Sequence, residues 1–83
     1  MTPMQEFALN ELRKRKEEGI GGSYLAVLWQ QHNGRYAHGS SRVRFGAISA
    51  AYRALGSLVS QNKARVEITS TSSGYTIYHF YII

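Results

Sequence analysis

A helix followed at once by a β-hairpin is the pattern in the second half of the chain that most constrains its fold. Apolar side chains recur at helical spacing over residues 49–61, with Ser49 at the N-cap position and Asn62 suited to a left-handed C-cap. The next segment alternates apolar and polar residues, and a Thr-Ser-Ser-Gly tip turns it back into a second run rich in β-branched and aromatic residues. We therefore expect a hairpin of 64–70 with 75–82.

The N-terminal segment predicts a further helix. Its apolar residues fall at helical spacing over residues 4–18, and Pro3 suits a first helical turn. Gly19 is a C-terminal stop for this helix. Gly21 and Gly22 extend the break, so we expect these glycines to form a linker.

Two structures compete for the segment SYLAVLWQQHN. Ser23 can cap a helix and Asn33-Gly34 can end it in a left-handed turn, which predicts a helix over 23–32. Asn-Gly is also a strong hairpin signal, and a hairpin within 24–45 would produce an αββαββ four-stranded sheet instead. The helix is favoured because Val27 is the only β-branched residue of the segment.

Length and composition limit the stabilising devices available to the chain. Its 83 residues fit a single domain over 1–83, and without Cys it has neither disulfides nor a thiolate zinc site to supplement a small core. The N-terminus has no apolar signal-peptide core, and no apolar run approaches the roughly 20 residues that cross a bilayer. We expect a cytoplasmic protein that does not enter a membrane.

The residues that catalysis requires are missing from the sequence. The chain has no Asp, and Glu67 is its only acidic residue beyond the first 18 positions, so paired carboxylates are not expected. The histidines lack the spacing of a metal site; they are His32, His38 and His79. We expect no enzyme activity, no metal and no cofactor.

The positive charge is confined to one part of the chain. Residues 1–18 carry equal numbers of basic and acidic side chains, whereas residues 19–83 carry six Arg and Lys against a single Glu. The whole net charge of +5 therefore lies in residues 19–83. An unbalanced positive field of this kind attracts polyanions such as double-stranded DNA.

The segment before the amphipathic helix fits a helix-turn-helix. A short helix over 41–45 would lead through a turn at Gly46 into the second helix, whose N-terminus would enter the major groove. The apolar face that we expect this helix to bury consists of Ile48, Tyr52, Leu55, Leu58 and Val59, and the expected exposed residues are Ser49, Ala50, Arg53, Ala54 and Ser57. Of the exposed set, only Arg53 can make a bidentate contact to guanine. The expected nucleic-acid-binding residues are Arg42, Arg44, Ser49, Arg53, Lys63, Arg65, Ser72 and Ser73.

Residues 25–68 resemble winged helix-turn-helix DNA-binding proteins of the bacterial and phage regulator or replication type. The matching residues are Asn33-Gly34, Ser40-Ser41, Gly46 with Ser49, and Arg53-Ala54-Leu55 with Leu58. The chain departs from the pattern in carrying Asn62 where such proteins usually have Gly. The resemblance implies an α+β, winged-helix-like fold and a role as a transcriptional regulator or a replication or mobile-element accessory factor.

The C-terminal strand raises the question of a partner. Both faces of 75–83 are apolar or aromatic, and an 83-residue monomer readily covers only one of them. We therefore expect self-association through this strand to form a homodimer. An alternative function is a phage-type inhibitor or adaptor without enzymatic activity, whose basic face docks an acidic protein.

Overall fold

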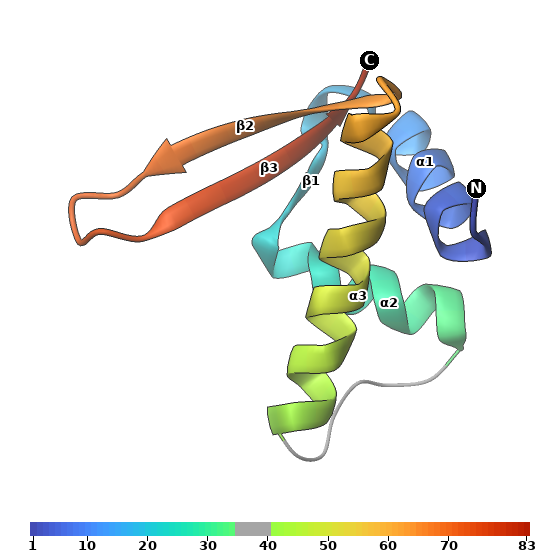
Figure 1. Cartoon of the computed structure of the whole chain (residues 1–83), viewed down its shortest axis with the longest axis horizontal. Helices are drawn as coiled ribbons and strands as arrows, with labels where there is room; N and C mark the ends of the chain where they lie inside the picture. Colours follow the sequence, from blue (N-terminus) through green and yellow to red (C-terminus); the bar gives the residue numbers. More distant parts are fainter. Residues whose placement is uncertain (35–40) are drawn as a thin grey trace.

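The computed structural model describes residues 1–34 and 41–83 and has an α+β architecture. The described part contains three α-helices and a three-stranded antiparallel sheet with strand order β1-β3-β2 (Figure 1). Short 3-10 turns at Lys16–Glu18 and Gly22–Tyr24 flank β1. The elements in chain order are α1 (Pro3–Arg15), β1 (Ile20–Gly21), α2 (Leu25–Asn33), α3 (Ser41–Ser60), β2 (Ala64–Ser70) and β3 (Thr76–Ile82).

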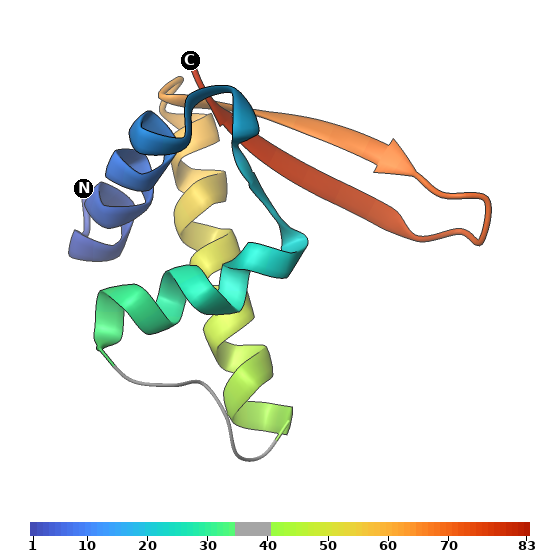
Figure 2. The same cartoon turned by 180° about the vertical axis from the view of Figure 1, so that it is seen from behind.

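The core lies where the three helices meet the base of the sheet. α1 and α2 both pack against α3, and the β2–β3 hairpin extends away from them, as the opposite views show (Figures 1 and 2). Each fully buried large side chain contributes about 1.5–3 kcal/mol of hydrophobic stabilisation. The side chains of this kind are Leu12, Ile20, Leu28, Leu55 and Leu58.

The N-terminal helix is confirmed, with a different end. Thr2 and Gln5 form a reciprocal capping box that satisfies two backbone N–H groups at its start, and Pro3 occupies the first turn. The α-helix ends at Arg15, and the last three residues of the expected span form the first 3-10 turn.

The expectation that the glycines form a linker is wrong. Ile20 and Gly21 form β1, which pairs antiparallel with Phe80 and His79 of β3. Ile20 is fully buried, so this two-residue strand attaches the α1–α2 connection to the core. A strand this short has no alternating pattern that a sequence could display.

The second helix is confirmed, and the alternative hairpin within 24–45 is wrong. Residues 25–33 are helical, and Gly34 closes the helix in a left-handed conformation with φ 68°. Ser23 was expected as the cap but lies inside the second 3-10 turn. Part of the second strand of that hairpin (35–40) lies outside the described residues.

A single helix replaces the expected pair of helices, so the turn at Gly46 is wrong. α3 is continuous over 20 residues, and Ser49 lies in its interior rather than at its N-cap. A glycine in a helix costs only about 1 kcal/mol relative to alanine. A continuous buried stripe along α3 outweighs that cost; its members are Ala47, Ala51, Leu55 and Leu58.

The C-terminal hairpin is confirmed. Ala64 to Ser70 pair with Ile82 to Thr76, and the tip turns at Gly74 with φ 88°. Asn62 adopts the expected left-handed conformation, with φ 60°. The Asn62 N–H donates to the Val59 carbonyl and the Lys63 N–H to the Leu58 carbonyl, which is a Schellman ending for α3.

Candidate nucleic-acid interface

A stripe of exposed and half-buried side chains on α3 is the centre of the candidate site. Phe45, Ser49, Tyr52 and Arg53 recur at spacings of four, three and one along the helix, so they lie on one side of it. We call these four residues the α3 stripe. Three of them, together with Ile48, line an open pocket of about 450 Å³. α3 contains no acidic residue, so the positive charge beside this pocket is not neutralised from within the helix.

The two described arginines of α3 lie on different sides of the helix. Arg44 and Arg53 are both exposed, but nine positions at about 100° each put them about half a turn apart. Neither makes an ion pair with the residues that the structure describes. Arg42 belongs to the first turn of α3, and its side chain lies outside the described part of the protein.

The cations at the base of the hairpin lie away from the α3 stripe. The Lys63 ammonium contacts the Met1 sulfur at 3.6 Å, at the end of α3 opposite to Arg44. Arg65 alternates with the half-buried Val66, so it lies on the sheet face that points away from α3. There it donates to Glu67 at 2.9 Å and stacks on the Tyr81 ring at 4.3 Å. The expected binding residues therefore do not form one surface.

The hairpin tip presents small hydroxyl side chains. Ser72 and Ser73 are exposed at the outer end of the hairpin, where it extends from the helices (Figure 1). The Thr71 hydroxyl accepts from the Tyr75 N–H at 3.1 Å and lies 3.2 Å from the Ser73 hydroxyl. These bonds order the turn, and the Ser72 hydroxyl makes no bond within the described residues.

Aromatic contacts join α3 to the hairpin. The Tyr52 ring meets Tyr78 and Phe80 of β3 edge-on, with ring centroids 5.4 and 5.8 Å apart. Burial raises the pKa of Tyr52 above its ordinary value of 10.0, and the charge of Tyr78 and a hydrogen bond to it add to the rise. Tyr52 therefore packs the α3 stripe against the face of the hairpin that carries Tyr78 and Phe80.

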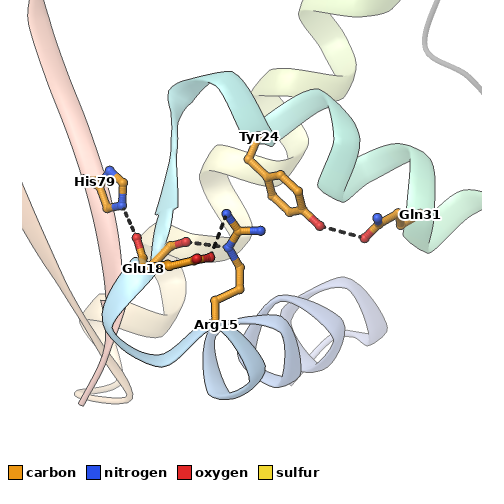
Figure 3. A network of polar contacts seen from close by, with 6 residues as sticks. Arg15, Glu18, Tyr24, Gln31 and His79 are labelled. Atoms are coloured by element: carbon orange, nitrogen blue, oxygen red, sulfur yellow. Dashed lines mark hydrogen bonds and ion pairs between the residues drawn. The ribbon is translucent and has the colours of Figure 1, made fainter.

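Arg15, the last residue of α1, stabilises local structure. The Arg15 guanidinium donates to the Gly19 carbonyl at 2.6 Å, lies 3.8 Å from the Glu18 carboxylate and covers the Tyr24 ring at 4.1 Å (Figure 3). The Glu18 carbonyl is in turn 2.6 Å from His79 Nε2 on β3. Arg15 is thus engaged in holding the turn before β1.

The sequence interpretation missed two residues of the site. Phe45 was expected at the end of the short helix over 41–45, outside the reading helix, yet it lies on the second turn of α3 and is 72% exposed. Tyr52 was placed on the buried face, yet it is 37% exposed at the edge of the pocket. Counting helical positions from Ser41 instead of Ser49 would have placed Phe45 beside Ser49 and Tyr52. The reverse error concerns Ala54, expected on the exposed face and in fact buried.

The described residues hold no group of three or more His, Asp or Glu arranged to bind a metal ion. Among the same residues, no helix is both long and apolar enough to cross a membrane. Comparison with protein-family models, with curated proteins and with solved structures finds no match to this chain.

Proposed function

We propose that this protein is a winged-helix-type DNA-binding protein in which α3 enters the major groove and the β2–β3 hairpin lies along the sugar-phosphate backbone. The order of elements carries the proposal: helix, strand, two helices and a hairpin, with β1 pairing beside β3. That order places a long helix next to a projecting hairpin, which is the arrangement of a reading helix and its wing. A role in transcription, replication or mobile-element maintenance accords with this mode of binding.

Charge supports the same proposal. Arg44 and Arg53 are exposed on α3, and no acidic side chain accompanies them on that helix. Since they lie on different sides of α3, they suit the two phosphate backbones that border a major groove better than a single contact line. Phe45 and Ser49 between them would meet base edges, where an aromatic ring contacts a thymine methyl group.

Salt dependence tests this function. Fluorescence anisotropy with random-sequence duplex DNA, single-stranded DNA and RNA is measured over a series of salt concentrations. We expect duplex DNA to bind most tightly, with affinity falling linearly on a log–log plot because phosphate contacts release counterions. The Arg44→Ala/Arg53→Ala double variant is expected to bind more weakly, with a salt slope smaller by about 2.

The matched control is Arg13→Ala/Lys14→Ala, which removes the same charge from α1. We expect its salt slope for duplex DNA to equal that of the unmodified chain, because these residues lie outside the candidate interface. If the two double variants bind equally well, the effect is one of net charge alone and α3 is not the binding element.

A protein-binding adaptor is the second candidate. Several large apolar side chains are exposed on α3 and the hairpin, which is a feature of protein-contact surfaces; they are Phe45, Ile68, Tyr75 and Ile77. The salt series separates the two functions. An adaptor would leave all three nucleic acids unbound at low salt.

A further inference from the structure

β2 is the edge strand of the sheet. β3 is central, with β2 on one side along its whole length and β1 on the other side over two residues. No described residue pairs with the outer edge of β2. The edge left free by this topology is therefore on β2 and, over a shorter stretch, on the outer half of β3.

The register of the hairpin shows which backbone groups this edge presents. The Thr71 N–H donates to the Tyr75 carbonyl, so this pair is of the hydrogen-bonded type. Types alternate along an antiparallel ladder, which directs the backbone groups of Arg65 and Glu67 toward β3. Those of the even-numbered residues point outward; they belong to Ala64, Val66 and Ile68.

The side chains of β2 complement a second copy of the same strand in one register. If two β2 strands pair antiparallel about Val66, Arg65 lies opposite Glu67 of the partner subunit, and this pair occurs twice by symmetry. Pairing about Glu67 would oppose two carboxylates, and pairing about Arg65 would oppose two guanidinium groups. Opposite charges stabilise directly facing positions and like charges destabilise them.

The geometry points to a two-fold symmetric homodimer formed through β2, centred on Val66 of each subunit. The outward backbone groups of Ala64, Val66 and Ile68 form the new ladder, and the two sheets become continuous. The Arg65 and Glu67 side chains are 54% and 57% exposed and pair with each other at 2.9 Å in the monomer. In the dimer each side chain exchanges that neighbour for the facing residue of opposite charge in the partner subunit.

Burial on the opposite sheet face agrees with this register. Ile68 lies on the same face as Val66 but is 62% exposed, because α3 does not reach that far along the hairpin. In the dimer Ile68 comes to lie beside Ala64 of the partner subunit. The register that pairs the charges therefore also covers an apolar side chain that the monomer leaves in water.

Sedimentation of the full chain without nucleic acid tests the dimer, over a protein range of about 1–100 µM. We expect the unmodified chain to dimerise. Arg65→Glu makes both facing positions acidic and Glu67→Arg makes both basic, so each variant alone is expected to dimerise at least about tenfold more weakly. Mixing the two variants restores opposite charges across the strand pair, and the mixture is expected to dimerise like the unmodified chain.

The double variant Arg65→Glu/Glu67→Arg is the matched control. It exchanges the charges within each strand, so it is expected to dimerise on its own. Far-UV circular dichroism of each variant verifies folding, and both substituted side chains are exposed.

Three outcomes would overturn the proposal. An unmodified chain that stays monomeric over the whole range has no such interface. Single variants that dimerise as tightly as the unmodified chain place the contact elsewhere, for example on the free part of β3. A mixture no more dimeric than its components contradicts the register about Val66. DNA binding does not enter this experiment, so its result is independent of the proposed function.

Discussion

Gly19 combines a positive φ with a close contact to the backbone of β3. Its φ is 64°, a value that favours glycine, and a Cβ built there would collide with the Phe80 carbonyl oxygen and approach the Tyr81 ring at 2.8 Å. This close approach lets β1 begin beside β3. The sequence predicts a helix stop at this position, but the neighbour that requires glycine belongs to the other end of the chain.

Gly19→Ala is expected to lower the free energy of unfolding by at least about 2 kcal/mol, because strain at positive φ adds to the clash with the β3 backbone. Urea denaturation measures this loss in the free energy of unfolding. The matched control is Gly22→Ala, whose added Cβ meets nothing within 4 Å. A control that loses as much stability as Gly19→Ala would show that the whole connection resists substitution.

The raised pKa of Tyr52 predicts that the stability of the protein changes with pH in the alkaline range. Its pKa is raised in the folded protein, chiefly by burial, so folding favours the neutral phenol. The contribution of Tyr52 to the stability of the folded protein is therefore fully present below pH 10 and is lost as the pH rises from 10 through the higher folded pKa. Tyr52→Phe is expected to make this fall shallower. Parallel stability curves for the two proteins above pH 10 would contradict the expectation.

At the scale of elements, α3 shows where sequence periodicity and tertiary packing differ. The N-cap preference of Ser49 and the presence of Gly46 both suggested a helix start inside what is one helix. Local preferences of this kind are worth about 1 kcal/mol each, and burial of one apolar side chain exceeds that. Because the helix is continuous, Phe45 belongs to the same helix as Ser49 and Arg53 rather than to a separate short helix. Local signals alone could not reveal this placement.

Gly46→Ala distinguishes a continuous helix from a turn. In the interior of α3, where an added Cβ meets nothing within 4 Å, alanine is expected to raise the free energy of unfolding by about 0.5–1 kcal/mol. If Gly46 instead lay in a turn that needs positive φ, alanine at this position would lower the free energy of unfolding. Gly56→Ala, on the same helix and equally unobstructed, serves as the control and is expected to stabilise by a similar amount.

At the scale of the whole molecule, α3 is the common support for α1, α2 and the base of β2. These elements pack against the buried side chains of α3, so a substitution that destabilises α3 is expected to destabilise the candidate interface as well. The sole Trp, Trp29 on α2, is half-buried against this core and reports on it.

Leu55→Ala is expected to lower the free energy of unfolding by about 2–5 kcal/mol, because Leu55 is fully buried and its removal leaves a cavity. Thermal unfolding is followed by far-UV circular dichroism and by Trp29 fluorescence, and both are expected to shift together as one transition. The control, Ile77→Ala at a hairpin position that is 47% exposed, is expected to change the free energy of unfolding by no more than about 0.5 kcal/mol. Transitions that separate between the two probes would contradict a single cooperative unit.

The sequence by itself determined the elements whose signals are local: α1 from its apolar spacing, α2 from its composition and Asn33-Gly34, and the hairpin from its alternation around Gly74. These signals lie within one or two turns of chain, where propensity and periodicity act. Only the tertiary structure decided β1, the continuity of α3 and the separation of Arg65 from Arg53. Each of these features depends on residues far apart in sequence. β1 forms because it pairs with Phe80, and α3 is continuous because it packs against α1 and α2. Arg65 is separated from Arg53 because α3 covers the other face of the sheet. Contacts between distant segments outweigh local preferences of about 1 kcal/mol, and no local pattern records them.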